Sequence, residues 1–403
     1  MRPGRPPRAP RPASGRREGT EATRARQLLS HFAARQAAAV DLLRRLVEID
    51  SPTCDKAAVD RMGAAVAREF RAAGVAVTLI PQQGAGDALR ASFGPEGDSP
   101  ALILGHLDTV WPPGEASRRP LTIEGGFARG PGVFDMKAGV VLCVLLARAF
   151  GEGAFRPRVP VVCFLSGDEE TGSPVSRPRL EEEAGRCRYV LGLEPCNPDG
   201  GAKTARKGVG RVVLEVEGTP AHAGIDPEKG VNAIEELAAQ VLAVKYLRDP
   251  GAGTTIHAGL IAGGVAKNVV APHARAEIDV RVPTPEEWAR VESAVLSLRL
   301  RDQRARLKVE ATLTHPPVVR TPANAALYER ARRAASEVGF ELGEGATGGG
   351  SDGSFCAALG VPILDGLGVE GEGAHAVSER VRLDRIAPRA AFLAHFLETV
   401  EGP

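Results

Sequence analysis

The sequence predicts an α/β fold: a mixed, largely parallel sheet with helices on both faces, together with an inserted α+β domain of four strands and two helices. Two observations support this prediction. Short apolar runs alternate with helical segments over the first half of the chain, which is typical of a parallel sheet. Near Lys207 the order changes to strand–helix–strand–strand–helix–strand, and the first pattern resumes after Pro316-Pro317.

The elements of the first half follow one another in a regular order. Apolar residues recur at helical spacing from Leu28 to Val47, and Asp50-Ser51-Pro52 ends that helix. Residues 136–150 are apolar nearly all round, which indicates a buried helix. Strands are expected at the short apolar runs 75–80, 101–105, 159–165 and 189–193.

The inserted domain is expected over residues 208–316. Its two helices should begin after Asp226-Pro227 and after Pro283. The main domain would then combine the two flanks, residues 27–207 and 317–403, and would carry the metal site described below. Strands of the inserted domain are predicted at residues 209–216, 254–261, 275–282 and 307–313.

The first 26 residues differ in composition from the rest. They contain five prolines and no apolar run, which predicts a disordered basic tail. Eight arginines against Glu18 and Glu21 give the tail a charge of +6, so a total of +1 leaves −5 for the remainder. Arg16-Arg17 resembles a twin-arginine export signal, but no apolar segment follows it, which favours a dispensable tail.

The composition narrows the class of protein. With 43% apolar and 25% charged residues, the chain has the composition of an ordinary soluble protein. No stretch is long and apolar enough to span a membrane, and a near-neutral body without a basic stripe argues against nucleic acid as a partner. The six cysteines show no C-x-x-C spacing. We therefore expect reduced cysteines and a cytoplasmic protein.

Histidines and acidic residues gather where the apolar runs end. Each group alone is compatible with a polar turn, a helix cap or a solvated loop. Together they supply two imidazoles and several carboxylates, which suit zinc, cobalt or manganese in a hydrolytic site. A further carboxylate beside such ligands can act as a base towards water. The groups are His106-Leu107-Asp108, Asp135-Met136-Lys137, Asp168-Glu169-Glu170, Glu194 and His375.

A competing motif lies at Gly349-Gly350-Ser351-Asp352-Gly353, which matches G-x-S-x-G. In serine hydrolases this motif follows a buried strand, whereas residues 341–347 are polar and glycine-rich. We therefore predict a tight backbone loop without a nucleophile. A serine hydrolase would require activity that resists chelators and is lost in Ser351→Ala.

The chain resembles the di-zinc metallopeptidase family that includes glutamate carboxypeptidases of the carboxypeptidase G type, aminoacylases and succinyl-diaminopimelate desuccinylases. The resemblance runs in order from about Leu28 to Leu397 and implies the di-zinc exopeptidase type of fold. The matching pieces are Gly105-His-Leu-Asp-Thr-Val, Arg129-Gly-Pro-Gly-Val-Phe-Asp-Met-Lys-Ala-Gly, Ser166-Gly-Asp-Glu-Glu-Thr-Gly-Ser, Leu193-Glu-Pro, Gly218-Thr-Pro-Ala-His-Ala-Gly, Gly348-Gly-Gly-Ser-Asp and Gly373-Ala-His.

The resemblance assigns metal ligands by position. It implies that Asp135 bridges two zinc ions, with cobalt or manganese as possible substitutes. His106 and Glu194 would complete one metal site, and Glu170 and His375 would complete the other. The resemblance also implies a cis peptide bond after Asp135.

Further roles follow from the same resemblance. Glu169 would be the general base, and Asp108 would orient His106. His222 matches a histidine that, in dimeric members, reaches the partner's active site and stabilises the oxyanion. Asn268 and Arg281 match residues that hold the substrate carboxylate, for which a guanidinium fork is suited.

The implied substrate has an amide bond next to a free carboxylate. Gly349 of the glycine loop would contribute to the substrate site. Ala205-Arg206-Lys207-Gly208 and the run from Leu364 to His375 resemble the glutamate carboxypeptidase branch, which predicts release of C-terminal glutamate. The alternative is an N-acyl amino acid deacylase of the aminoacylase or desuccinylase type. A metal-stabilised binding protein without catalysis is disfavoured, because all five ligands and Glu169 are present. We expect a homodimer paired through the inserted domain.

Overall fold

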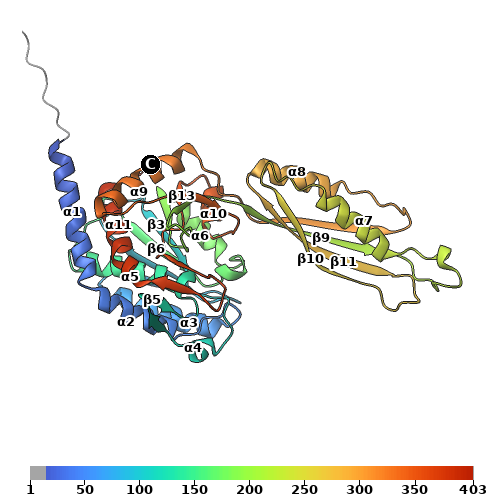
Figure 1. Ribbon diagram of the computed structural model, residues 1–403, viewed down its shortest axis with the longest axis horizontal. Coiled ribbons are helices and arrows are strands. Elements are labelled where there is room, and N and C mark those ends of the chain that lie inside the picture. Colours follow the sequence, from blue (N-terminus) through green and yellow to red (C-terminus); the bar gives the residue numbers. More distant parts are fainter. Residues whose placement is uncertain (1–14, 403) are drawn as a thin grey trace, which may run out of the picture.

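The computed structural model describes residues 15–402, which form a rounded main body and an elongated second body (Figure 1). The main body is built on a six-stranded sheet with the order β1-β2-β6-β3-β7-β14. Strands β6, β3, β7 and β14 run parallel, whereas β1 and β2 are antiparallel to their neighbours. The strands are β1 (Ala76–Ile80), β2 (Ala88–Phe93), β3 (Ala101–His106), β6 (Val161–Ser166), β7 (Tyr189–Gly192) and β14 (Ile363–Leu364).

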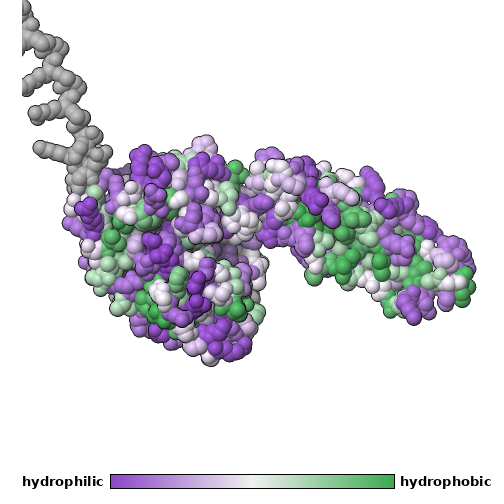
Figure 2. Space-filling model, in the orientation of Figure 1, coloured by the Kyte–Doolittle hydropathy of each residue, from purple (hydrophilic) through white to green (hydrophobic). Residues whose placement is uncertain are grey.

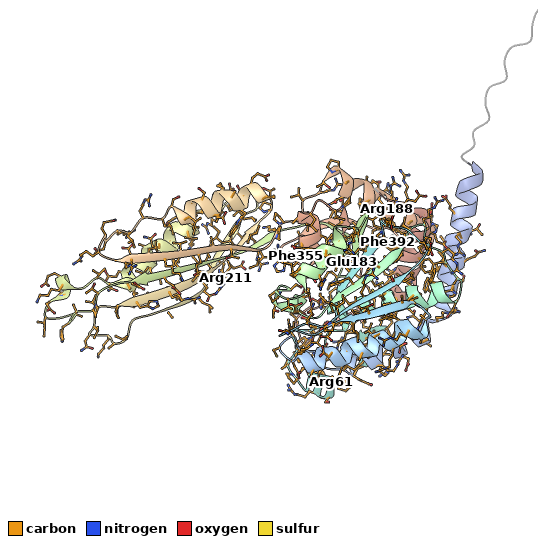
Figure 3. All side chains as sticks on the ribbon, turned by 180° about the vertical axis from the view of Figure 1, so that it is seen from behind. Arg61, Glu183, Arg188, Arg211, Phe355 and Phe392 are labelled. Atoms are coloured by element: carbon orange, nitrogen blue, oxygen red, sulfur yellow. The ribbon has the colours of Figure 1, made fainter. Side chains whose placement is uncertain are left out.

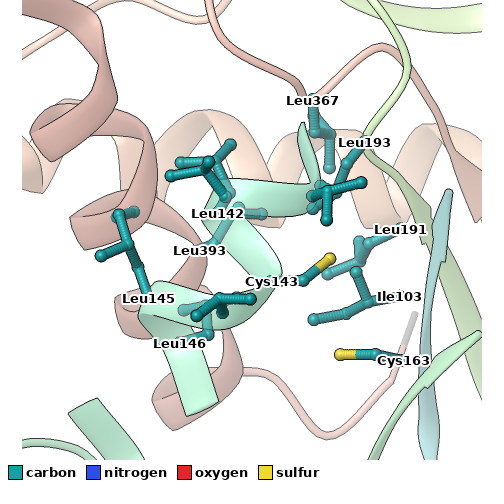
Figure 4. Packing of buried hydrophobic residues seen from close by; sticks show 14 of the residues in the cluster. Ile103, Leu142, Cys143, Leu145, Leu146, Cys163, Leu191, Leu193, Leu367 and Leu393 are labelled. Carbon is teal, nitrogen blue, oxygen red and sulfur yellow. The ribbon is translucent and has the colours of Figure 1, made fainter. Parts of the chain in front are cut away.

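Helices cover both faces of this sheet, as predicted. One face packs against α5, whose Cys143 points toward Ile103 and Cys163 of the strands (Figure 4). The other face packs against α6 and α10. The helices of the main body are α1 (Gly15–Ala33), α2 (Gln36–Val47), α3 (Lys56–Ala72), α4 (Glu115–Arg118), α5 (Ala138–Gly151), α6 (Arg177–Ala184), α9 (Pro322–Val338), α10 (Gly353–Ala358) and α11 (Ile386–Thr399).

Two small sheets join distant segments beside the carboxyl ends of β3, β6 and β7. One has the order β15-β16-β5-β4, and the other pairs β13 with β8 in parallel. The first sheet brings the residues around His375 next to the loop that contains Asp135. The strands are β4 (Thr122–Glu124), β5 (Phe127–Arg129), β8 (Ala202–Arg206), β13 (Glu344–Thr347), β15 (Gly371–Glu372) and β16 (Arg380–Arg382).

The second body is an antiparallel sheet with the order β10-β11-β9-β12. Helices α7 and α8 lie on one face of it (Figure 1) and enclose a core of their own around Trp288 and Val291. Because β9 and β12 are paired, the two ends of this insertion lie side by side, with Val209 opposite His315. The elements are β9 (Gly208–Glu217), α7 (Ala233–Lys245), β10 (Thr255–Gly263), β11 (His273–Val282), α8 (Pro285–Leu296) and β12 (Arg306–His315).

The N-terminal part of the structure corrects two expectations. The helix predicted over residues 28–47 is two helices, α1 and α2, with a turn between them. Residues 15–26, expected to be part of a disordered tail, form the first turns of α1. Arg24 from this segment donates from Nε to Glu398 on α11 at 2.8 Å. The remainder of the predicted tail, residues 1–14, lies outside the described residues.

Eight strands were not among the expected elements, namely β2, β4, β5, β8, β13, β14, β15 and β16. Strand β2 is absent from the expected elements, although it lies between β1 and β6. Strand β13 precedes the glycine loop at Gly349, but exposed and half-buried residues alternate along it, so the loop does not follow a buried strand. Within residues 15–402, no helix has both the length and the apolarity needed to cross a bilayer.

Candidate metal centre

Three neighbouring parallel strands deliver the first ligands to one edge of the main sheet. His106 is the last residue of β3, Glu170 follows β6, and Glu194 follows β7. Since β6, β3 and β7 are adjacent and parallel, their carboxyl ends meet at this edge. Asp135 enters from the loop after β5, and His375 lies between β15 and β16.

The five residues form two groups that share Asp135. In the first group, Nε2 of His106 lies 3.2 Å from Oδ1 of Asp135 and 3.7 Å from Oε1 of Glu194. In the second group, Nε2 of His375 lies 3.3 Å from Oδ2 of Asp135 and 3.1 Å from Oε2 of Glu170. The two oxygens of one carboxylate therefore face two different ligand sets.

The donor set fits two divalent metal ions. Each group offers one imidazole nitrogen and carboxylate oxygens, which suit zinc, cobalt or manganese. Oε1 of Glu170 is buried and has no hydrogen-bond partner among the described residues, and such a buried oxygen is expected to have a partner. The peptide bond between Asp135 and Met136 is cis, as the resemblance implied.

Glu169 lies beside the first group but belongs to neither. Its Oε2 is 4.0 Å from Nε2 of His106. Burial, and then the charge of Glu194, raise the pKa of Glu169 well above its ordinary value. Burial and the charge of Asp135 likewise raise the pKa of Glu194 to about 8. Because an opposite charge nearby lowers the pKa of a carboxyl group, bound cations would oppose both shifts.

Asp108 holds both the histidine and the acidic pair in place. Its Oδ1 accepts a hydrogen bond from the backbone N–H of Glu169 at 3.2 Å and lies 3.5 Å from Nδ1 of His106. Its Oδ2 accepts from the backbone N–H of Glu170 at 3.1 Å and from the hydroxyl of Thr53 at 2.7 Å. Nδ1 of His106 is closer, at 3.0 Å, to the main-chain oxygen of Asp108. Sequence reasoning missed Thr53, which belongs to no motif.

Glu379 is a second residue that sequence reasoning missed. Its carboxylate is buried and accepts hydrogen bonds from the backbone N–H groups of Gly132, Phe134 and Asp135 at 2.8–2.9 Å, and from the indole of Trp111 at 3.0 Å. Burial raises the pKa of Glu379 against the opposing effect of these bonds. Because Glu379 is on the segment that follows His375, it links this segment to the loop that carries Asp135.

The glycine loop is fixed by a buried ion pair. Nε of Arg206 donates to Oδ2 of Asp365 at 2.7 Å, and Nη1 of Arg206 donates to the main-chain oxygens of Gly349 and Gly350 at 3.1 Å. Ser351 is buried and donates its hydroxyl to the same Asp365 oxygen at 2.8 Å. Its hydroxyl is therefore engaged in a structural contact, as expected of a loop without a nucleophile.

A cavity of about 750 Å³ opens beside the metal centre. Both bodies line it: Arg281 comes from β11, and Gly349 comes from the glycine loop. Arg177 and His315 also line this cavity and were not singled out from the sequence. Glu169, Glu170 and His375 form its metal-side wall.

His222 and Asn268 lie apart from this centre. The main-chain oxygen of Asn268 accepts from the N–H of Ala223 at 3.0 Å, so the two predicted residues are neighbours. The side chain of His222 is exposed. The segment after β9, residues 218–230, lies at the end of the second body that points away from the main body (Figure 1). Within one chain, neither residue belongs to the metal centre or its cavity.

Comparison with known proteins places the chain in a family. Carboxypeptidase G2 from Pseudomonas sp. (strain RS-16) is 30% identical over 369 residues, covering 89% of this chain and 88% of that protein. Succinyl-diaminopimelate desuccinylase from Methylobacterium sp. (strain 4-46) is 30% identical over 329 residues, covering 72% of this chain and 78% of that protein.

A solved structure and a family model agree with these relatives. The crystal structure of the aminopeptidase PepT from Bacillus cereus ATCC 10987 has a TM-score of 0.74 at 24% identity, covering 90% of this chain and 98% of that chain. The model of the peptidase family M20/M25/M40 matches residues 102–399, a range that contains all five metal-ligand candidates. The protein is therefore a metal-dependent hydrolase that belongs to peptidase family M20/M25/M40.

Proposed function

We propose that this protein is a zinc-dependent carboxypeptidase that hydrolyses an amide bond next to a free carboxylate and releases C-terminal glutamate. The observation that supports hydrolysis by this protein is the position of Asp135 between two ligand groups. Glu169 lies next to these groups, 4.0 Å from His106, and belongs to neither, so its carboxylate is available as a base.

The ligands of two zinc ions would be His106, Asp135, Glu170, Glu194 and His375. When bound, the ions lower the pKa of water and polarise the substrate carbonyl. Glu169 takes the proton of the attacking water and transfers it to the leaving amine. Asp108 fixes the position of Glu169 through its hydrogen bond to the Glu169 backbone N–H.

The choice of glutamate rests on the hinge sequence Ala205-Arg206-Lys207-Gly208 and on the likeness to carboxypeptidase G2. Arg281 lines the cavity from the second body and is proposed to orient the carboxylate next to the scissile amide, which would replace Asp279 as its partner. Asn268 would take part in the same contact from a partner subunit. Gly349 would border the substrate on the main-body side.

A hydrolysis panel tests this proposal. The zinc-loaded protein is given N-acyl derivatives of glutamate and of other amino acids, together with N-succinyl-diaminopimelate. We expect the highest kcat/KM for the glutamate conjugates. Glu169→Gln serves as the control, because it should abolish every activity that arises at this site. A clear preference for a non-acidic amino acid would contradict the glutamate assignment.

The alternative is an N-acyl amino acid deacylase. The observation that favours it is the likeness to succinyl-diaminopimelate desuccinylase over 72% of the chain. The same metal centre and the same Glu169 would serve both reactions, so the substrate contacts alone distinguish them. Faster release of succinate than of glutamate in the panel would select this alternative.

We also propose that the active unit is a homodimer formed through the second body. Strand β10 is an edge strand, and Leu260 and Ile261 on it are 64% and 65% exposed. Tyr246, directly after α7, is 78% exposed. Apolar residues gather on the face of this body seen in Figure 2, and such a patch at a sheet edge is a pairing surface. In a dimer, His222 would reach the centre of the partner.

We propose the cytoplasm as the compartment of this protein. All six cysteines are free, and Cys143, Cys163, Cys196 and Cys356 are buried. A reducing compartment preserves such thiols. Cell fractionation of the native host tests this placement, and recovery of the protein outside the cytoplasm would contradict it.

A further inference from the structure

Two arginines line the cavity beside the metal centre, and they differ in which of their nitrogens already donate hydrogen bonds within the chain. Arg281 donates from both Nε and Nη2 to the carboxylate of Asp279 at 2.9–3.1 Å. Its remaining Nη1 donates to the main-chain oxygen of Gly348 at 3.2 Å. The two nitrogens of Arg281 that could bind a carboxylate in a bidentate way, Nε and Nη2, therefore already bind a carboxylate of the same chain.

Arg177, at the start of α6, has the opposite arrangement. Its Nε donates to Glu181 one turn later at 2.7 Å, and its guanidinium carbon lies 4.4 Å from the ring centre of Phe355. These two contacts fix the plane of the group. Both Nη atoms remain without a hydrogen bond to any residue in the described range. A fixed guanidinium with its two terminal nitrogens free is prepared for a bidentate carboxylate.

The imidazole of His315 lines the same cavity as this guanidinium. It stacks on the same phenyl ring, with ring centres 5.1 Å apart and an angle of 26° between planes. Figure 3 shows Phe355 on the side of the main body that faces the second body. Gly172 and Gly350 leave room for the imidazole, because a Cβ on either would lie within 3.2 Å of a ring atom.

The electrostatic environment of His315 is positive. Burial, and then the charges of Arg281, Arg177 and Arg206, lower the pKa of His315 to about 4, so its ring is neutral near pH 7. Two bound divalent ions would neutralise the negative charge of the carboxylates on the metal side of the cavity. A substrate with one carboxylate, held by Arg281, would leave the two terminal nitrogens of Arg177 without an acceptor.

We propose that Arg177, which lines this cavity with His315, is a specificity-determining residue that binds a second carboxylate of the substrate, the one on the side chain of the released amino acid. This inference rests on the proposed function and names the contact that would select glutamate over uncharged residues. The substrate class is therefore an N-acyl amino acid with an acidic side chain.

The test compares glutamate with glutamine, which has nearly the same shape without the charge. Arg177→Gln should lower kcat/KM for an N-acyl-glutamate by about 10- to 100-fold, the effect of losing a charge-assisted bidentate contact. The value for the matching N-acyl-glutamine should stay within about threefold, which also shows that the variant is folded. Arg177→Lys, which keeps the charge and loses the fork, should fall between the two.

Arg179→Gln is the matched control. Arg179 is on the same helix, is 62% exposed and pairs with Glu182 at 2.9 Å, so its loss should change neither substrate. Equal losses on both substrates in Arg177→Gln, or no loss on either, would overturn the inference.

A binding measurement separates this inference from the proposed function. Titration calorimetry of the zinc-loaded protein with free glutamate and free glutamine does not depend on turnover. If the wild-type protein hydrolyses neither conjugate but binds glutamate more tightly through Arg177, the proposed function fails and the subsite stands. If it hydrolyses the glutamate conjugate and Arg177→Gln retains the preference for glutamate, the subsite fails alone.

Discussion

Glu169 and Glu170 are adjacent in the chain, yet their carboxylates face different partners. Oε2 of Glu170 is 3.1 Å from His375, whereas Oε2 of Glu169 approaches His106 at 4.0 Å. The difference arises in the short turn after β6, where both backbone N–H groups bind Asp108. One carboxylate of Asp108 thus orients a metal-ligand candidate and a base candidate in different directions.

The first prediction separates these two roles. Glu169→Gln should retain both metal ions and lose about 100- to 10,000-fold in kcat, because the amide cannot accept the proton. Glu170→Ala should lose metal as well as activity. Metal content by mass spectrometry and steady-state kinetics check both variants. If Glu169→Gln loses metal and Glu170→Ala does not, the two assignments are reversed.

The second prediction concerns Glu379. Glu379→Gln keeps the size of the side chain but places an NH₂ group opposite backbone or indole donors. We expect metal affinity to fall by about 10- to 100-fold, as for other groups that orient ligands, and the free energy of unfolding to fall by about 1–3 kcal/mol. Metal titration and urea unfolding measure these effects. Glu372→Gln is the control, because Glu372 is 64% exposed on neighbouring β15; equal effects in both variants would contradict the role of Glu379.

At the scale of elements, strand order explains which parts of the site could be predicted. His106, Glu170 and Glu194 follow apolar runs, and parallel neighbouring strands bring such ends together. Nothing local marks Thr53 or Glu379, because their partners come from loops that meet only in the folded chain. In the sequence, both residues are indistinguishable from polar residues of an ordinary solvated segment.

Physical reasons also explain why the sequence did not predict β2 and the first turns of α1. Strand β2 contains Arg90, which interrupts its apolar pattern and pairs with Glu183 on α6 at 2.8 Å. The composition of residues 1–26 as a whole is typical of a disordered tail, so it did not indicate the first turns of α1. The last proline of that segment is Pro12, and the residues after it include Ala, Glu and Arg, which favour helix.

The third prediction uses the site without metal. The folded pKa values of Glu194 and His375 are raised, to about 8 and about 10, so the folded protein holds these protons more tightly than the unfolded chain. Stability of the metal-free protein should therefore fall as pH rises from about 6.5 to 8, by up to about 1.4 kcal/mol per pH unit for Glu194 and by less for His375, whose side chain is 53% exposed. Urea unfolding after chelation measures this slope. Saturating zinc should remove it, because the ligands bind metal in their deprotonated forms. A metal-free protein that gains stability over this range would contradict the prediction.

At the scale of the whole molecule, His222 and the metal ligands are on different bodies. The main body carries Glu169 and the ligands, and the second body carries His222 at its far end. If His222 stabilises the oxyanion as proposed, it would have to reach the site from a second chain or through a large closure of the two bodies. The apolar edge around Leu260 favours the second chain.

The fourth prediction tests this sharing. His222→Ala and Glu169→Gln should each be inactive alone and should regain part of the activity after being unfolded and reassembled together. In a mixed dimer, one site would then combine an intact His222 with an intact Glu169 from the other chain. Kinetics on mixed dimers, verified by differential tagging, give the measurement. A fully active monomer, or verified mixed dimers without activity, would refute the shared site.

The pairing of β9 with β12 has a consequence for the modular construction of this protein. Because Val209 and His315 are opposite each other, the chain leaves and re-enters the main body at nearly one point. The insertion could therefore be exchanged for a short turn, or transplanted, without moving the strands on either side. We expect residues 208–315 to fold as a separate protein around Trp288, and the rejoined flanks to retain their metal ions while losing turnover. Circular dichroism and metal analysis of the two halves would reveal whether chemistry and assembly reside in exchangeable units.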